Sequence, residues 1–259
     1  MNITFGIIVG PNHEPDIVRK LIDSIFAQDF EDHDYEIVVC GNYESDPELG
    51  IKVIPFDESQ KRGWITRKKN LIAKAANYDT LCILHDYYLL DKDWYQGVLK
   101  YSRLNRKWNV LCSRVLRLEG DRHSDWLINQ KYMDRLLVKH PELGPELMAV
   151  APTENNGPRW VCALPYWEIG LWPMQYVSGG YILARTNVFR EIPFDERYGW
   201  GEAAEDIIWS EQVIEHEYKI SFNPYSLVTL QKPGKWRVHQ MTEKCVEILK
   251  EMFLDGDRI

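Results

Sequence analysis

The stretch TLCILHDYYLLDKDW, residues 80–94, decides the fold that we expect for this chain. Its first five residues are almost all apolar or β-branched, which is typical of a strand buried on both faces of a sheet. The apolar run ends in His85 and Asp86, so the strand brings a carboxylate to its carboxyl end. In open α/β sheets this edge binds ligands. Asp86 is therefore a candidate to hold a divalent cation and its diphosphate, although an aspartate here is also common as the start of a turn or a helix cap.

Strands and helices alternate on both sides of this stretch. Before it the pattern predicts strands at 3–9, 35–40 and 51–55 and helices at 16–26 and 61–76; after it, a helix at 92–101 and a strand at 110–118. This alternation indicates right-handed βαβ units and a mainly parallel sheet. The ends of the first two strands would then share the edge of Asp86. That edge, with Val9, Gly10, Pro11 and Asn42, is a natural nucleotide site.

The helix expected at 61–76 carries cations near its start, among them Arg67, Lys68 and Lys69. Cations near a helix N-terminus work against the helix dipole, so either an anion lies nearby or the run is a solvated face. Arg67 is the strongest candidate for an anion contact, because it lies one turn after Trp64 and just before the Asp86 strand.

Composition excludes several classes of protein. The 259 residues fit one large α/β domain, alone or with an appended region. The net charge of −8 and the scattered basic residues do not indicate nucleic-acid binding. Five cysteines, an odd number without CxxC spacing, predict reduced core thiols and no zinc site or disulfide framework. A strand from residue 3 and the lack of an apolar run of about 18 residues predict a soluble, cytoplasmic protein without a signal peptide or membrane span.

The second half contains a looser region and then a glycine-rich strand start. Between 119 and 176 prolines and tryptophans recur, and we expect one helix at 126–139 and otherwise ordered binding loops. Gly179 and Gly180 precede a strand at 181–184, where paired glycines indicate close approach of a ligand or backbone.

An acidic segment follows that strand. Gly199, Trp200 and Gly201 lead into Glu202, Glu205 and Asp206 at the start of a helix. The helix dipole favours one such carboxylate whatever the function, but it does not readily explain three. Strands are expected at 219–223 and 226–230 and a last helix at 241–254. His239 follows a glycine-containing loop, where a lone histidine is more commonly a surface or capping residue than a ligand.

Together these segments resemble the GT-A glycosyltransferases over nearly the whole chain. The first half looks like the nucleotide-sugar half of family 2 enzymes, and residues 66–90 also resemble the region leading into the DxD motif of the β-1,4-galactosyltransferases. There His85, Asp86, Tyr87 and Tyr88 match His-Asp-x-Asp, with Tyr88 at the second aspartate. SGGYILART and GWGEAAED resemble the two segments that build the acceptor site, with two alanines inserted before the Glu-Asp pair.

The resemblance implies an α/β GT-A (Rossmann-like) fold, in which a mixed, mainly parallel sheet is flanked by helices in one continuous domain. Residues 1–118 would bind the nucleotide sugar and residues 119–259 the acceptor. It implies donor contacts at Val9, Gly10, Pro11, Asn42, Arg67 and Asp86, with Arg67 on the diphosphate. Gly179, Gly180, Trp200 and Glu205 would bind sugar or acceptor, and Asp206, with Glu205, would be catalytic.

The resemblance further implies Mn²⁺ or Mg²⁺ held by Asp86 and His239. A phenol, with a pKa near 10, is a poor replacement for a metal carboxylate at Tyr88. Either Asp86 and His239 suffice with waters and phosphate oxygens, or Asp91 or Asp93 contributes, or no metal is used.

The leading hypothesis is an inverting glycosyltransferase with a carboxylate base, moving a sugar from a UDP-sugar to a glycan or lipid-linked acceptor in polysaccharide biosynthesis; peripheral membrane contact is compatible with this. The alternatives are a retaining transferase and a catalytically silent carbohydrate-binding protein of the same fold. A nucleotidyltransferase is disfavoured because no Gly-rich phosphate loop follows the first strand.

Overall fold

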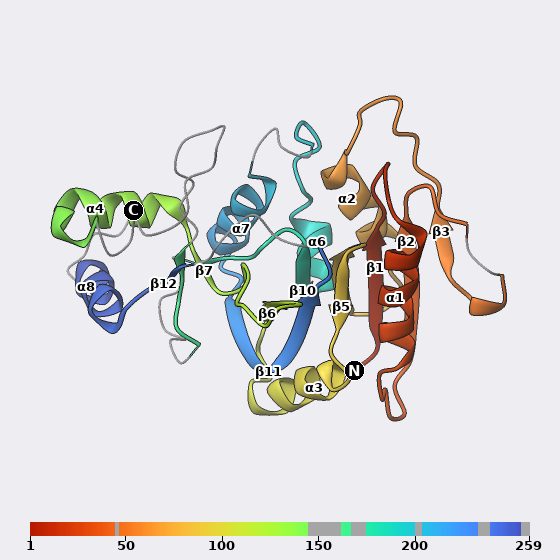
Figure 1. The fold of residues 1–259 in the computed structure, drawn as a ribbon, viewed down its shortest axis with the longest axis horizontal. Coiled ribbons are helices and arrows are strands. Elements are labelled where there is room, and N and C mark those ends of the chain that lie inside the picture. Colours follow the sequence, from red (N-terminus) through yellow and green to blue (C-terminus); the bar gives the residue numbers. More distant parts are fainter. Residues whose placement is uncertain (45–46, 145–161, 167–174, 200–203, 233–238, 255–259) are drawn as a thin grey trace.

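The computed structural model has an eight-stranded sheet at its centre and describes every residue except 45–46, 145–161, 167–174, 200–203, 233–238 and 255–259. The strand order is β3-β2-β1-β4-β10-β6-β11-β5 (Figure 1). The first four in space are parallel: β3 (Lys52–Ile54), β2 (Tyr35–Cys40), β1 (Ile3–Ile8) and β4 (Thr80–His85). Beyond them lie β10 (Tyr181–Arg185), β6 (Val110–Arg117), β11 (Ile220–Leu230) and β5 (Tyr88–Leu90).

Only β10 and β5 run against the other strands of this sheet. β10 pairs antiparallel with both β4 and β6, β6 pairs parallel with β11, and β5 pairs antiparallel with β11. Ile8 at the end of β1 is in register with Cys40 on β2 and with His85 on β4. The expected mainly parallel α/β sheet is confirmed, and the ends of β1, β2 and β4 meet at one edge as predicted.

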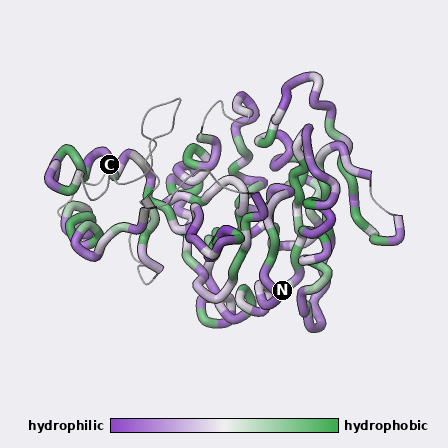
Figure 2. The backbone as a smooth tube through the Cα atoms, viewed as in Figure 1, coloured by the Kyte–Doolittle hydropathy of each residue, from purple (hydrophilic) through white to green (hydrophobic). Residues whose placement is uncertain are grey.

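Helices cover both faces of the sheet, and the sheet separates the core into two layers. On one face α1 (Pro15–Phe26) and α3 (Trp94–Leu104) pack with the strands through the cluster that contains Leu21 and Val98. On the other, α2 (Ile65–Ala75), α6 (Thr186–Glu191) and α7 (Glu205–Glu215) pack through the cluster that contains Ile72 and Trp209. Figure 2 shows hydrophobic segments along the central strands and hydrophilic ones in the surrounding loops.

The sequence of α1 explains its position. Pro15 stands in the first turn, where a missing N–H costs nothing, and Asp16 beside it complements the helix dipole. Val18, Leu21, Ile22 and Ile25 recur at intervals of three and four residues and are buried, so one apolar stripe faces the sheet.

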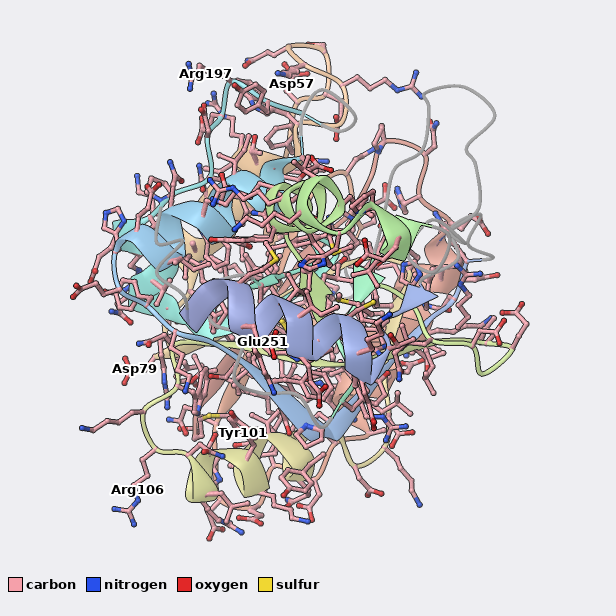
Figure 3. The ribbon with its side chains drawn as sticks, turned by 90° about the vertical axis from the view of Figure 1, so that its left-hand side faces the viewer. Asp57, Asp79, Tyr101, Arg106, Arg197 and Glu251 are labelled. Atoms are coloured by element: carbon pink, nitrogen blue, oxygen red, sulfur yellow. The ribbon has the colours of Figure 1, made fainter. Side chains whose placement is uncertain are left out.

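A small second sheet with the order β12-β8-β7-β9 lies beside the central one. Its strands are two residues each: β12 (His239–Gln240), β8 (Cys162–Ala163), β7 (Leu127–Ile128) and β9 (Gln175–Tyr176). Beyond it α4 (Gln130–Lys139) and α8 (Glu243–Leu254) form one end of the molecule (Figure 1). Figure 3 looks onto that end, with α8 in front and α3 below. Short 3₁₀ turns occupy Pro47–Leu49 and Pro141–Leu143.

Two expectations about elements were wrong, and one strand was not expected. The helix expected from residue 126 begins at Gln130, because Leu127–Ile128 pairs in β7 and the Asn129 side chain caps the helix by accepting from the Lys131 N–H. Between Asp86 and the helix expected from residue 92, the chain forms β5, a strand that the sequence did not predict and that pairs with the end of β11. The two strands expected at 219–223 and 226–230 form one strand, β11, interrupted by an irregularity between Asn223 and Leu227.

Two further features concern cysteines and membranes. Cys40, Cys82, Cys112 and Cys245 are free thiols and buried. Among the helices in the described ranges, none combines the length and the apolar character needed to cross a membrane.

Candidate active site

A cavity of about 640 Å³ opens at the carboxyl edge of the sheet, where the ends of β1 and β4 meet. The loop after β1, the start of α2 and the segment after β11 complete its wall. Its lining residues are Ile8, Gly10, Pro11, Asn12, His13, Arg62, Gly63, Ile65, Lys68, His85, Asp86, Tyr87 and Lys232.

Asp86 is the buried carboxylate of this cavity, with 5% of its surface exposed. Its backbone N–H donates to Ile8 O (3.1 Å), and its Oδ2 accepts from the Gly10 N–H (3.2 Å). Burial raises the pKa of Asp86 above its usual value, while the Gly10 N–H and the charge of Lys232 oppose that shift. The loop after β1 is therefore tied to the carboxylate that ends β4.

Three cationic side chains line the same cavity: Arg62, Lys68 and Lys232. Lys68 is fully buried; its Nζ donates to Val9 O (2.7 Å) and pairs with Glu58. Lys232 lies over the Tyr87 ring, 5.1 Å from its centroid. A cavity with this excess of positive side chains over carboxylates is suited to an anion such as a diphosphate.

Of the six residues that we expected to contact the donor, Gly10, Pro11 and Asp86 line this cavity, and the Val9 carbonyl anchors Lys68. Asn42 is exposed and does not line it. Arg67 also lies outside the lining: its guanidinium stacks 4.7 Å from the Trp64 ring centroid and stands 3.9 Å from Glu196.

Sequence reasoning did not single out His13, Arg62, Lys68 or Lys232 as cavity residues. The basic run that begins at Lys61 indicated Arg62 and Lys68, but the sequence alone did not show which side chains of the run face the cavity. Lys232 had no local signal, because its place depends on β11 pairing with β6 and β5.

The predicted catalytic pair lies in the first turn of α7, beside the turn that precedes β10. Glu205 Oε1 accepts from the fully buried Lys69 Nζ (3.1 Å). Asp206 Oδ2 accepts from the Gly179 N–H (2.9 Å), and its Oδ1 accepts from the Ile207 N–H (2.9 Å). The structure thus brings Gly179, Glu205 and Asp206 together. Lys69 lies with them, although the sequence indicated it only as part of a basic run.

Burial raises the pKa of Asp206 to about 6, and the neighbouring Glu205 charge adds to this shift. Lys69 and the N–H groups of Gly179 and Ile207 act in the opposite direction. A carboxylate with a pKa near the working pH is suited to accept a proton and to release it again.

The two glycines leave no room for side chains. A Cβ on Gly179 would lie 2.5 Å from Glu205 Oε1 and 3.1 Å from Lys69 Nζ. A Cβ on Gly180 would lie 2.7 Å from the Tyr88 ring. The paired glycines therefore admit the carboxylate on one side and a buried phenol on the other. The sequence pattern predicted close approach of a ligand or backbone, whereas the close neighbours in the structure are side chains.

His85 links the cavity to the turn that contains Gly179 and Gly180. It lines the cavity, its backbone N–H donates to Gly180 O (2.9 Å), and its Nδ1 lies 2.9 Å from the Tyr87 hydroxyl. Burial, with the nearby Lys69 and Lys68 charges, lowers the pKa of His85 to about 3. The ring is therefore neutral at ordinary pH and adds no charge between the two parts of the site.

The described side chains near Asp86 offer a divalent cation few ligands. Tyr88 is buried against Gly180, and Asp91 and Asp93 follow β5, which runs back to the opposite edge of the sheet. Among the described residues no group of three His, Cys, Asp or Glu side chains could hold a metal. Asp86 remains, and Mg²⁺-type sites with one carboxylate plus substrate phosphates are common, so the cavity fits a cation held mainly by its ligand. Trp200 and the His239 side chain lie outside the described part.

Comparisons with known proteins find similarity in structure only. No protein-family model and no curated protein matches the sequence. S. aureus TarS 1-349 in complex with UDP-GlcNAc matches with 14% identity and a TM-score of 0.53 over 100% of this chain and 68% of that chain. The same protein in complex with UDP matches with 12% identity and a TM-score of 0.50, over 100% and 67%. S. aureus TarS itself gives 12% identity and a TM-score of 0.50, and this chain covers 41% of it. The strand order and these matches together show that the chain has the GT-A glycosyltransferase fold.

Proposed function

We propose that this chain is an inverting glycosyltransferase that moves one sugar from a UDP-sugar to a hydroxyl of a glycan or lipid-linked acceptor. The observation that carries the proposal is the pairing of a cationic cavity with a carboxylate of raised pKa at one sheet edge, joined by the His85–Gly180 hydrogen bond. The structures of TarS in complex with UDP and with UDP-GlcNAc support a uridine nucleotide as the first ligand to test.

The diphosphate of the donor would lie against Lys68, Arg62 and Lys232. As the bond from the anomeric carbon to the diphosphate breaks, negative charge grows on the leaving UDP, and fixed cations in a partly buried cavity stabilise it. Asp86, with His239 as a proposed second ligand, would hold Mn²⁺ or Mg²⁺ at the diphosphate. When bound, the metal supplies further neutralisation of the leaving group.

Asp206 is the proposed general base. It would take the proton of the acceptor hydroxyl while that oxygen attacks the anomeric carbon opposite the leaving diphosphate, so the sugar inverts its configuration. Glu205, held by Lys69, would bind acceptor hydroxyls, and Trp200 would stack on a sugar. Gly179 and Gly180 would let sugar and carboxylates approach each other.

A silent carbohydrate-binding protein is the second candidate, because the buried Tyr88 stands where the resembling family has a second metal carboxylate. Binding of a glycan without consumption of any donor, unaffected by Asp206→Asn, would favour it. Among active enzymes, the anomeric configuration of the product separates inverting from retaining transfer.

The first experiment is calorimetric titration of UDP into the protein with Mn²⁺ and, separately, with EDTA, followed by UDP-GlcNAc, UDP-glucose and UDP-galactose with detection of released UDP. We expect UDP to bind in the presence of Mn²⁺. In the Asp86→Ala variant, we expect Mn²⁺ to have no effect on UDP binding.

Asp93→Ala is the matched control, since this carboxylate comes from the same sequence segment but is exposed beyond β5. It should bind UDP like the wild type. Equal loss of binding in both variants, or no binding of UDP by the wild type under either condition, would contradict the proposed donor site.

A further inference from the structure

Lys69 is a fully buried cation that the donor cavity does not use. It follows Lys68 on α2, yet the two amines serve different places. Lys68 Nζ donates to Val9 O in the wall of the cavity, whereas Lys69 Nζ donates to Glu205 Oε1 (3.1 Å) at the start of α7. Successive residues on a helix point about 100° apart, so one turn of α2 reaches both parts of the site.

The surroundings of Lys69 offer few other ways to compensate its charge. Its Nζ lies 4.5 Å above the centroid of the Phe194 ring, and a Cβ on Gly179 would stand 3.1 Å from it. Taking an ammonium out of water costs several kcal/mol unless a partner compensates it. Among the described residues its ionic partner is Glu205, whose side chain is itself only 13% exposed.

Building on the function proposed above, we propose that Lys69 is a positioning residue that fixes Glu205 and keeps Asp206 ionised as the base. Two carboxylates on successive residues repel each other, so one of them tends to keep its proton. A buried ammonium on Glu205 offsets that repulsion. Without it, Asp206 would be protonated over more of the working pH range and unable to accept a proton.

The charged and titratable groups facing Asp206 are few in the described structure. Glu205 comes from its own helix, Lys69 from α2 and the Tyr88 phenol from β5, while the Gly179 N–H adds a hydrogen bond from the turn before β10. Of these, Glu205 raises the pKa of Asp206, and Lys69 and the Gly179 N–H lower it. Lys69 supplies the full positive charge in this set.

The test is a carboxyl ¹³C NMR titration of wild type, Lys69→Met and Glu205→Gln, with Asp206→Asn to assign the signal. We expect the midpoint of Asp206 to rise by about 1 pH unit in Lys69→Met, the size typical of a nearby charge. It should fall in Glu205→Gln. In the double variant Lys69→Met/Glu205→Gln, which buries no unpaired charge, the two shifts should largely cancel.

Lys68→Met is the matched control, because the neighbouring lysine faces the cavity. It should weaken UDP binding and leave the midpoint of Asp206 within about 0.3 unit, because its ammonium pairs with Glu58 and Coulomb interactions weaken with distance. If Lys69→Met fails to fold, the Glu205→Gln variant and the double variant decide. An Asp206 midpoint that is equal in wild type, Glu205→Gln and the foldable Lys69 variants would overturn the inference.

Donor consumption distinguishes this inference from the proposed function. In wild type, the acid limb of kcat/KM for UDP release should follow the NMR midpoint, and in the Lys69 variant it should move to higher pH. A purely structural role would lower the rate at every pH without moving the limb. Normal NMR shifts without UDP release from any tested donor would contradict the proposed function while leaving the role of Lys69 in ionising Asp206 intact.

Discussion

At the residue scale, Asp206 shows that a proposed catalytic charge can lower the stability of the fold. Its pKa is about 6 in the folded protein, above the value near 3.9 of an unfolded aspartate. The folded state therefore holds the proton more tightly than the unfolded state between these values. As pH rises from about 4 to about 6, the stability contribution of this group falls, and above pH 6 it stays low.

Asp206→Asn should consequently stabilise the protein at neutral pH. We expect its free energy of unfolding at pH 7 to exceed that of the wild type by about 1–3 kcal/mol, with the difference shrinking as pH falls towards 4. Urea unfolding at several pH values measures it. The same variant should lose about 10²- to 10⁴-fold in transfer rate, the usual worth of a general base.

The exposed Asp93→Asn is the control and should change stability by no more than about 0.5 kcal/mol at any pH. If Asp206→Asn instead destabilised the protein equally at pH 4 and pH 7, the carboxylate would be a structural hydrogen-bond acceptor rather than a strained charge.

Residue types at strand and helix ends were predictable, whereas side-chain directions within a run were not. Asp86 follows an apolar run, and the strand register alone places it at the ligand edge. In the basic run on α2 the sequence favoured Arg67 as the anion contact, whereas Lys68 lines the cavity and Arg67 does not. Arg67 is 41% exposed, whereas Lys68 and Lys69 are fully buried, because the side of the helix that faces the sheet edge depends on its packing.

At the element scale, the turn from Ser178 to Gly180 positions both the carboxylates and the sheet. Tyr181 N–H donates to Ser178 O (3.3 Å) at this turn, and each glycine faces a different neighbour. Substituting them one at a time should therefore separate catalysis from stability.

Gly179→Ala should lower activity much more than stability. Its Cβ would displace Glu205 Oε1 and Lys69 Nζ, the far ends of flexible side chains. Gly180→Ala should destabilise by about 1–3 kcal/mol, because its Cβ meets the buried, rigid Tyr88 ring. Thermal unfolding and UDP release on both variants test this contrast, and equal losses of stability would refute it.

Long elements with clear periodicity were predicted well, whereas the six-residue helix α6 and all the two- and three-residue strands except β3 were missed. β5 was not predicted because Tyr88–Leu90 becomes a strand only through its pairing with Leu230, Thr229 and Val228, far along the chain. β7 was read as helix because Leu127 and Ile128 continue an apolar pattern and only their partners in β8 and β9 make them a strand. Local sequence does not encode such long-range pairing.

Over the whole molecule, charge is distributed unevenly between the site and the chain. The net charge is −8, yet Arg62, Lys68 and Lys232 line the cavity. An anionic ligand is thus repelled by the molecule at long range and attracted close to the cavity. The local attraction involves one exposed side chain, Arg62, so it should respond to salt.

We expect Arg62→Ala to weaken UDP binding several-fold at about 50 mM salt. Raising the salt from about 50 to about 500 mM should then weaken UDP binding less in this variant than in the wild type. Uridine, which has no diphosphate, should show neither effect. Lys74→Ala, an exposed cation of α2 outside the cavity, is the control and should behave like the wild type. Calorimetry with both ligands measures this, and a salt response shared by UDP and uridine would argue against a diphosphate at the cations.

The position of β10 also determines which strands lack a partner while the ribosome is still synthesising the chain. Residues 181–185 fit between β4 and β6, and residues 220–230 fit between β6 and β5, so strands made late fill gaps between strands made early. Until residue 185 has been synthesised, the nascent chain has β4 and β6 with unpaired edges and apolar surface on both faces. Strands of such intermediates tend to pair wrongly with strands of other chains. Chaperones that hold nascent chains should matter more for the yield of this protein than the stability of its finished sheet suggests.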